Sequence, residues 1–503
     1  MARIAVIGAG TGAMAAAARL AVAGHRVVVY ERTETYGGAV RRFERDGFRF
    51  DTGPGLLTLP AVYRDLFVKT GKEPLEDCVE LVQVDPSSRH VFADGSEVSL
   101  PNASRAGVVA ALDEALGAGA GERWGDFLVR AREAWDRTRR PLLEEPLWPD
   151  WQVLAGKEPY PAVPHKRLLR TRRARTLAEI ASWELRDERL EALLMSHALA
   201  YGLAPWAAPA SAAVLPYMEH AFGTWYVRGG IRELARAVYE RCLARRVEFV
   251  FGAEVTRIVE KDGRAAGVEL ADGGVADADH VVADVHPARL RALTRRPLDD
   301  EGDVRADPGA TPPARFTLLL ALRGGREPSA AHRTVVHPAA PESEWDFLAS
   351  PGGDEPPSPT VTVLRPDDPA LRPDDAHESV VLSATVSTEA AWEDEGTVRR
   401  YTDFLLEAAE RAVPGLRERL LWHEARAPRD TEDETGAPCG AVPAPALAAG
   451  QGRFLHPANT TRLPGLYRVG GWSHPGGGLA HAGMSGALVA GLIVEGPEFR
   501  GSQ

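Results

Sequence analysis

The chain opens on Ile4-Ala5-Val6-Ile7-Gly8-Ala9-Gly10-Thr11-Gly12-Ala13, an apolar run followed at once by a glycine-rich turn. The apolar run predicts a short buried strand, and the alanine-rich stretch at 13–23 predicts the helix after it. A second apolar run ends on an acid, Glu31, which lies 23 residues after Gly8. This order and spacing predict a βαβ unit that binds a dinucleotide.

The residue types in this turn suit a pyrophosphate. Gly8 allows the tight turn, and Gly10 lets the backbone approach the phosphates at the helix N-terminus. Ala13 replaces the usual third glycine and still permits close helix–strand packing, while Glu31 is expected to bind a ribose hydroxyl. The cofactor-binding residues predicted in this unit are Gly8, Gly10, Thr11, Gly12, Ala13 and Glu31.

The segment after Glu31 indicates which dinucleotide is bound. It contains a double glycine, Gly37-Gly38, and then Asp46-Gly47-Phe48-Arg49-Phe50-Asp51-Thr52-Gly53-Pro54. A nicotinamide-binding domain has no general need for the double glycine. At these residues the chain resembles the two-dinucleotide-binding flavoproteins and, within them, the phytoene desaturase (carotenoid desaturase) family. That family carries an acid, a double glycine and a DGFxFDxGP stretch in this order.

The resemblance implies that the cofactor is FAD. It also implies that the Gly37-Gly38 turn lies close to the phosphates, with Arg32 and Ala39 beside it. The family usually has an arginine where this chain has Ala39. Arg41 and Arg42 are the candidates to replace that arginine.

Later segments extend the resemblance to the middle and the end of the chain. Residues 223–230 are similar to the family's GxWYPxGG stretch, and the family residue that matches Val255 touches the adenine through its backbone. Residues 465–478 and the helix after them are similar to the family's segment beside the flavin. The resemblance places these further residues at the cofactor: Val255, Gly470, Gly471, Gly477, Gly478 and Leu479.

The resemblance implies an α/β fold of two lobes, in which a Rossmann-type FAD-binding domain is interleaved with an α+β substrate domain. The length of 503 residues exceeds a single core and agrees with two lobes. Stretches rich in Pro, Asp and Gly at 296–313 and 350–375 are expected to be surface loops. The predicted FAD-binding domain comprises residues 1–105, 223–290 and 450–503, and the predicted substrate domain comprises residues 106–222 and 291–449.

Composition agrees with an enzyme. The net charge of −12 argues against binding to nucleic acid. The chain has no run of 18 or more apolar residues that would predict a spanning helix. The first predicted strand begins at Arg3, which leaves no room for a signal peptide. Cys78, Cys242 and Cys439 have the spacing of neither a disulfide framework nor a metal site, so a cytoplasmic protein without a bound metal is expected.

A basic run at 165–175 stands out in this acidic chain, since seven of its eleven residues are His, Lys or Arg. A solvated helix face is one explanation of such a run. The functional alternatives are contact with an anionic membrane surface, as in a peripheral membrane protein, and docking of an acidic carrier protein that presents a tethered substrate.

A group of aromatic residues has two interpretations. The side chains can line a tunnel for a long apolar or conjugated substrate, or they can belong to the ordinary core. The group consists of Trp148, Trp151, Tyr160, Trp206 and Tyr217.

Two histidines lie in the segment that is similar to the flavin-contacting segment of the family. His474 is expected to fix the backbone of a His-Pro-Gly turn beside the flavin. His481 stands where the family usually has glycine, and the resemblance places it beside the isoalloxazine ring. An imidazole there is a candidate catalytic base, because its ordinary pKa lies near neutrality. The alternative for His481 is a structural role.

These observations predict an FAD-dependent desaturase or oxidase that dehydrogenates a hydrophobic, polyene- or carotenoid-like substrate, either free or tethered to a carrier. Reduced FAD is expected to pass its electrons to oxygen or a quinone. The alternatives are a flavin amine oxidase, an isomerase that uses reduced flavin and, in another class, a non-catalytic lipid or prenyl escort protein of the same fold.

Overall fold

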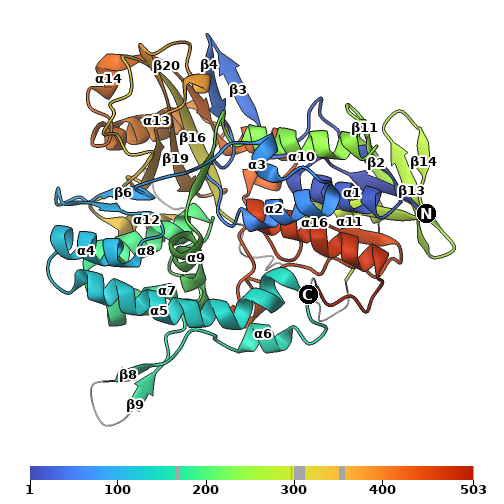
Figure 1. Cartoon of the computed structure of the whole chain (residues 1–503), viewed down its shortest axis with the longest axis horizontal. Coiled ribbons are helices and arrows are strands. Elements are labelled where there is room, and N and C mark those ends of the chain that lie inside the picture. Colours follow the sequence, from blue (N-terminus) through green and yellow to red (C-terminus); the bar gives the residue numbers. More distant parts are fainter. Residues whose placement is uncertain (166–169, 296, 300–311, 350–356, 502–503) are drawn as a thin grey trace.

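The computed structural model describes residues 1–165, 170–295, 297–299, 312–349 and 357–501. Within these ranges, five parallel strands form one sheet (Figure 1). The strand that precedes the first glycine-rich turn is central, so this turn opens at the carboxyl edge of the sheet. In sheet order the strands are β11 (Glu248–Val250), β2 (Arg26–Tyr30), β1 (Arg3–Ile7), β15 (His280–Ala283) and β21 (Leu466–Arg468).

The two faces of the parallel sheet are covered by different layers. Ile4 and Val6 pack against helices, whereas Ala5 and Ile7 pack against a small antiparallel sheet. This alternation is the pattern of a strand buried on both faces. The helical layer contains α1 (Thr11–Val22), α10 (Arg232–Ala244), α16 (Leu479–Val494), α2 (Ala61–Thr70) and α3 (Leu75–Cys78). The other layer contains β12 (Val255–Lys261), β13 (Arg264–Leu270), β14 (Val275–Asp277) and α11 (Pro287–Thr294).

A mixed sheet of seven strands, counted over the described ranges, forms the core of a second region. In sheet order its strands are β20 (Leu420–Arg426), β16 (Ala314–Arg323), β19 (His377–Val386), β18 (Val361–Leu364), β17 (Arg333–Val336), β6 (Ser88–Val91) and β7 (Glu97–Leu100). Its nearby helices are α12 (Pro341–Ala349), α13 (Glu395–Glu410), α14 (Leu416–Arg419) and α15 (Pro428–Thr435).

Strand β18 corrects the expectation of a continuous surface loop over 350–375. Val361 and Val363 are fully buried, because β18 pairs with both β17 and β19. The surrounding prolines and aspartates hid a short alternating segment that is a central strand. Most of the other expected loop, 296–313, lies outside the described residues.

The segment before residue 105 contributes to both sheets, since β1 and β2 belong to the parallel sheet and β6 and β7 to the mixed one. Strand β5 (Leu81–Gln83), which lies between these strands in the chain, forms a short ladder with β10 (Trp225–Val227). The interleaved α/β architecture is therefore confirmed, and the boundaries chosen for the two domains stay a prediction.

The DGF motif forms a hairpin, β3 (Arg42–Arg45) and β4 (Phe48–Asp51). Its two-residue turn, Asp46-Gly47, has φ values of 51° and 79°, as this kind of tight hairpin turn requires. Phe48 and Phe50 are buried against one face of the mixed sheet. The hairpin thereby ties the segment after the double glycine to the second region.

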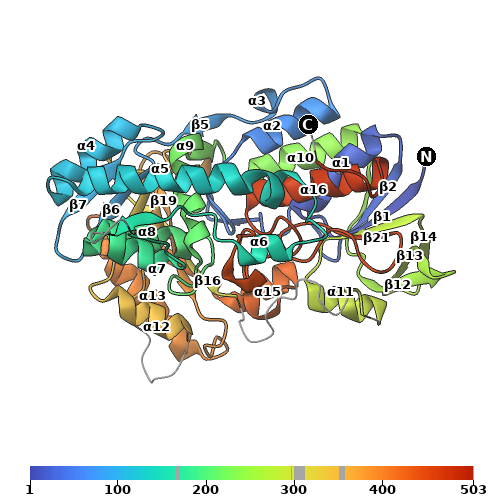
Figure 2. The same ribbon diagram turned by 90° about the horizontal axis from the view of Figure 1, so that it is seen from below.

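A helical layer, with its own apolar core, covers the remaining side. Figure 2 shows α5 extending from this layer toward α16. The layer contains α4 (Arg105–Leu116), α5 (Ala120–Arg139), α7 (Leu177–Ile180), α8 (Glu188–Ala200) and α9 (Val214–Phe222), with α6 (Gln152–Gly156) beside it.

The described part of the basic run is a hairpin, β8 (Val163–His165) and β9 (Arg170–Arg172), so the helix-face interpretation is wrong there. The hairpin projects from the body of the molecule (Figure 1), and residues 166–169 lie outside the described residues. The guanidinium of Arg172 lies 4.2 Å from the ring centroid of Trp183, which anchors the base of the hairpin. Among the described helices, none has the length and apolar composition needed to cross a membrane.

Candidate functional site

The first glycine-rich turn delivers the N-terminus of α1 to the carboxyl edge of the parallel sheet. Gly8 has a φ of +92°, which an L side chain rarely adopts, and α1 begins at Thr11. The backbone amides of Thr11 and Gly12 lie in the first turn of α1 and have no intrahelical acceptor. Free amides at a helix N-terminus form an anion-binding site, so the turn fits the pyrophosphate of a dinucleotide.

Close packing explains the small residues that follow. A Cβ added at Gly12 would lie 2.8 Å from the Gly470 Cα, so α1 approaches the second glycine-rich segment only without a side chain there. Ala13 is completely buried, as expected for a helix–strand contact. Gly10 has a further constraint, because a Cβ at this position would overlap the carboxyl group of Asp284.

Glu31 lies at the end of β2 and is buried beside the first turn. Its Oε2 accepts a hydrogen bond from the Ala9 amide at 2.8 Å, and its Oε1 accepts from the Thr33 amide and hydroxyl, both at 2.8 Å. The carboxylate therefore fixes the turn, and its remaining lone pairs are available to ribose hydroxyls.

The double glycine lies against the first turn. The Gly37 amide donates to the Ala9 carbonyl at 2.7 Å, and a Cβ at Gly38 would lie 3.1 Å from the Gly10 Cα. Ala39 is exposed after this contact. Arg32 is exposed and its guanidinium donates to the Asp433 carbonyl.

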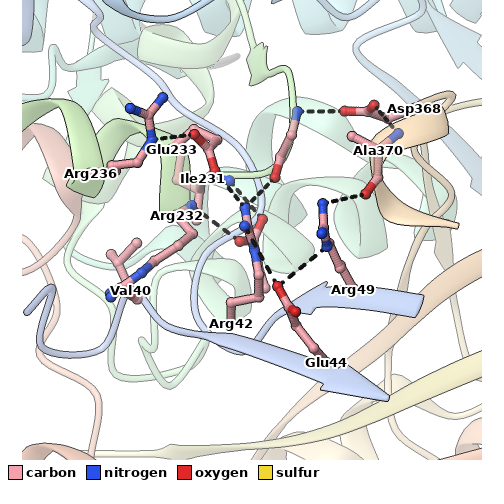
Figure 3. Close-up of polar contacts among 12 residues, drawn as sticks. Val40, Arg42, Glu44, Arg49, Ile231, Arg232, Glu233, Arg236, Asp368 and Ala370 are labelled. Atoms are coloured by element: carbon pink, nitrogen blue, oxygen red, sulfur yellow. Dashed lines mark hydrogen bonds and ion pairs between the residues drawn. The ribbon is translucent and has the colours of Figure 1, made fainter. Parts of the chain in front are cut away.

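The two arginines that could replace the missing family arginine point in different directions. Arg41 donates to the Gly38 carbonyl at 2.9 Å and to the Thr33 hydroxyl at 3.0 Å, so it contacts the cofactor-facing turn. Arg42 instead donates to the Gly229 carbonyl and to Glu233, as Figure 3 shows. Geometry favours Arg41 as the replacement.

Val255 is buried at the start of β12. The segment before it lies beside Glu31, because the Ala253 amide donates to the Glu31 carbonyl at 2.8 Å. The Val255 carbonyl accepts from Arg289 at 3.1 Å. The structure therefore brings the predicted adenine and ribose residues together.

The second glycine-rich segment, residues 470–478, leads into α16. The Gly470 amide donates to the Ser485 hydroxyl at 3.1 Å, and the Tyr63 hydroxyl donates to the Leu479 carbonyl at 2.9 Å. Gly478 has a φ of +98° and precedes the first residue of α16. These contacts fix the turn at the same end of the sheet as the α1 N-terminus.

A segment that the sequence interpretation missed, residues 441–446, packs across this second turn. A Cβ at Gly477 would overlap the Pro443 carbonyl, and a Cβ at Gly471 would lie 2.9 Å from the Pro443 ring. The Gly477 amide donates to the Ala444 carbonyl at 2.8 Å. Nothing local in the sequence signals this contact.

Three imidazoles surround the second turn, those of His474 and His481 buried and that of His456 half-buried. His474 Nε2 donates to the Glu145 carbonyl at 3.0 Å, and His456 Nε2 donates to the Ala444 carbonyl at 2.7 Å. The His481 ring has no hydrogen-bond partner within the described ranges. Burial lowers the pKa of each of the three to about 4, so each is neutral at neutral pH. His481 thus presents uncharged ring nitrogens in the first turn of α16.

Asp284 was also missed by the sequence interpretation. It follows β15, the neighbour of β1, and its carboxyl contacts both glycine-rich turns. Its position directly after a parallel strand is the signal that could have found it, since ligands bind at the carboxyl ends of such strands.

The aromatic residues do not form one group. Tyr160 is fully buried in the helical core and donates to Glu184 at 2.8 Å, and Trp206 and Tyr217 pack at the edge of the same core. Trp148 and Trp151 belong to a separate small cluster beside α6.

The parallel sheet, the α1 N-terminus and the two glycine-rich turns define a two-lobed, dinucleotide-binding oxidoreductase. Residues 14–494 match the family described as flavin containing amine oxidoreductase, and the chain belongs to this family. The chain is 30% identical to the 4,4'-diapolycopene oxygenase of a Methylomonas species over 98% of each chain. It is also 30% identical to the hydroxyneurosporene desaturase of Cereibacter sphaeroides, over 98% of this chain and 97% of that protein.

The fold also matches that of a solved oxidoreductase from Methanosarcina mazei, with a TM-score of 0.65 and 20% identity over 97% of this chain and 99% of the other. The protein is an FAD-dependent oxidoreductase. The expected cofactor and the expected class of enzyme are both confirmed, and the class excludes the non-catalytic escort alternative.

Proposed function

We propose that this FAD-dependent oxidoreductase dehydrogenates a hydrophobic polyene. The observation that carries the proposal is the similarity over nearly the whole chain to relatives named for acting on diapolycopene and hydroxyneurosporene. The apolar character of the region beside the second turn supports it. Ala480, in the first turn of α16, and Leu447 share one apolar cluster with α5, α8 and α9.

The proposed cofactor site consists of the residues predicted from the sequence. The free amides of Thr11 and Gly12 would receive the pyrophosphate, and Glu31 the ribose hydroxyls. Val255 would lie at the adenine, and the turn at 470–478 at the flavin. Arg41 joins this set because it contacts the double glycine.

Bound FAD supplies the acceptor for a hydride from the substrate. Removing two hydrogens from adjacent carbons also releases a proton, and a ring nitrogen of His481 is proposed to accept it. The uncharged ring can do so at neutral pH, although burial makes it a weaker base than an ordinary histidine. Tyr63 holds the backbone at Leu479 and so orients the helix turn that carries His481.

An anaerobic reduction assay tests the proposed substrate class. The holoenzyme is mixed with an acyclic polyene in detergent micelles, and flavin bleaching and the shift of the polyene absorbance to longer wavelength are followed together. Both changes are expected. Bleaching by a polyamine but not by the polyene would favour the amine oxidase alternative. A double-bond shift that requires prior reduction of the flavin would favour the isomerase.

We also propose that the projecting hairpin contacts an anionic partner, either a lipid surface or an acidic carrier protein. Arg175 is exposed at its base, whereas Arg172 packs on Trp183 and Arg173 donates to the Glu158 carbonyl at 2.7 Å. Arg175 is therefore a residue to replace without loosening the base, and Arg170 is replaced with it because it belongs to the same basic run. Each basic residue near an anionic membrane contributes about 1 kcal/mol.

Vesicle flotation at low and high salt tests the hairpin. The R170Q/R175Q variant is compared with R399Q/R429Q, which changes the net charge equally at exposed sites elsewhere. Salt-sensitive binding to anionic vesicles that only the hairpin variant loses is expected for a lipid surface. Equal binding by both variants would reject the hairpin as the contact. Loss of binding to an acidic carrier domain, without any vesicle binding, would assign the carrier.

A further inference from the structure

Asp284 joins the two glycine-rich turns. A Cβ at Gly10 would overlap its Oδ2, and a Cβ at Gly470 would overlap its Oδ1. Both turns therefore approach this carboxyl group so closely that a side chain at either position would require the carboxyl group to move. The Asp284 amide also donates to the Ile7 carbonyl at 2.9 Å, which holds the residue in register with β1.

The carboxyl group lies beside the anion-binding end of α1. The Asp284 Oδ2 accepts a hydrogen bond from the Ala13 amide at 3.3 Å, and the Glu31 carboxylate accepts one from the Ala9 amide on the other side of the turn. Between them lie the amides of Gly10, Thr11 and Gly12, of which those of Thr11 and Gly12 belong to the first turn of α1 and have no intrahelical acceptor. A pyrophosphate received there adds negative charge next to two carboxyl groups.

The surroundings of Asp284 offer little to offset a negative charge. Glu31 faces it across the turn, and the contacts from α1 and from the second turn are backbone groups and glycines. On its own segment, His286 uses its Nδ1 to accept from the Ala288 amide, and burial lowers the pKa of this histidine. Burial, followed by the Glu31 carboxylate, raises the pKa of Asp284 to about 7.

We propose that Asp284 is a cofactor-positioning residue that serves as a neutral carboxylic acid when FAD binds, so that FAD affinity falls as the pH rises. A protonated carboxyl can donate a hydrogen bond to a phosphate oxygen, whereas a carboxylate can only repel it. The inference rests on the proposed placement of the pyrophosphate at the α1 N-terminus. It assigns a pH-dependent function to the residue that links the two turns.

Quenching of flavin fluorescence by the apoprotein measures FAD Kd directly, without any turnover. For the wild type between pH 6 and pH 9, Kd is expected to rise toward tenfold per pH unit once Asp284 loses its proton in the free protein. D284N keeps the shape and a neutral donor, so its Kd is expected to stay low and nearly constant. A pH-independent wild-type Kd, or a D284N Kd with the wild-type slope, would overturn the proposal.

Two controls distinguish a failure of this proposal from a failure of the proposed cofactor site. E31Q is expected to weaken FAD binding and to keep a pH dependence, because Asp284 is still present, but to shift it to lower pH, because the charge of Glu31 no longer raises the pKa of Asp284. If E31Q and G10A both leave Kd unchanged at every pH, the placement of FAD at α1 is wrong, which is a different failure. If D284N does not fold, calorimetry of the wild type at pH 8 in buffers of different ionisation enthalpy replaces it. Uptake of up to one proton with FAD is expected, and no uptake would reject the proposal.

Discussion

The two glycine-rich turns serve one site but are built in different ways. Residues 8–12 lie between β1 and α1, so strand, turn and helix follow one another in the chain. Residues 470–478 are shaped by distant parts of the chain, including Pro443, the Glu145 carbonyl and His456. The first turn is a local structure, and the second depends on the assembled fold.

The turns also differ in their electrostatic surroundings. The first is flanked by the carboxyl groups of Glu31 and Asp284, which lie beside the first amides of α1, and these have no intrahelical acceptor. The second is surrounded by imidazoles that burial keeps neutral. The comparison indicates that one turn is suited to a charged, hydrogen-bonding ligand group and the other to an uncharged environment. Variants in each turn should therefore affect different measurements.

The largest expected effect belongs to the second turn. H481A should slow flavin reduction by substrate about 10²–10⁴-fold, the usual contribution of a general base, while the FAD content stays unchanged. Single-turnover bleaching under anaerobic conditions isolates this step from reoxidation. The matched control is H456A, which removes a half-buried imidazole beside the turn, one that donates a hydrogen bond to the Ala444 carbonyl. Equal bleaching rates for H481A and the wild type would leave His481 with a structural role.

In the first turn, E31A should weaken FAD binding by about 1.5–3 kcal/mol, or roughly 10- to 150-fold in Kd, as for hydrogen bonds to a charged group. E31Q retains one acceptor oxygen and should lose less. Because Glu31 also holds the Ala9 and Thr33 amides, thermal unfolding of the apoprotein is measured in parallel. Undiminished FAD occupancy of E31A across a dilution series would contradict the assignment to the ribose.

The next largest effect is a loss of stability that we expect from disturbing the close packing in the second turn. G477A places a Cβ on the Pro443 carbonyl and should cost about 1–3 kcal/mol of stability, as overpacking usually does. G156A is the control, since Gly156, like Gly477, is not among the glycines of positive φ, but a Cβ there meets nothing within 4 Å. Urea unfolding of both variants separates the close contact from the general effect of replacing glycine by alanine. Equal losses would show that the contact with Pro443 is unimportant.

The contrast between the local first turn and the second turn, which depends on the assembled fold, also explains how much could be predicted from the sequence. The βαβ unit and the position of Glu31 were predictable, because strand period, glycine spacing and the final acid are encoded within consecutive residues. Pro443 and Asp284 were not, since each acts on glycines of the two turns that are far away in the chain, such as Gly477 for Pro443 and Gly10 for Asp284. Strand β18 was missed for a related reason, because only its pairing with β17 and β19 makes Val361–Leu364 a strand rather than part of a loop.

The neutral imidazoles predict the acid sensitivity of the second turn. The pKa of His474 is about 4 in the folded protein and about 6.5 in an unfolded chain, so the unfolded state binds more protons between these values. Stability should therefore fall as the pH drops from about 6.5 to about 4, by up to about 1.4 kcal/mol per pH unit for one histidine. Asp284 contributes the opposite slope, because its folded pKa of about 7 is raised. Urea midpoints of H474N should fall less steeply over this range than those of the wild type, and parallel profiles would contradict the assignment.

The smallest expected effect distinguishes two neighbouring arginines beside the first turn. Arg41 donates to the Gly38 carbonyl, whereas Arg42 donates to the Gly229 carbonyl and Glu233 (Figure 3). R41Q should therefore weaken FAD binding by about 1 kcal/mol, roughly fivefold in Kd, because it loosens the double glycine and removes a cation near the phosphates. R42Q removes the same charge one residue later and should leave Kd within twofold, although it breaks an ion pair with Glu233. Because the two variants match in charge and chemistry, an equal loss in both would mean that overall charge, and not the contact with the double glycine, sets the affinity.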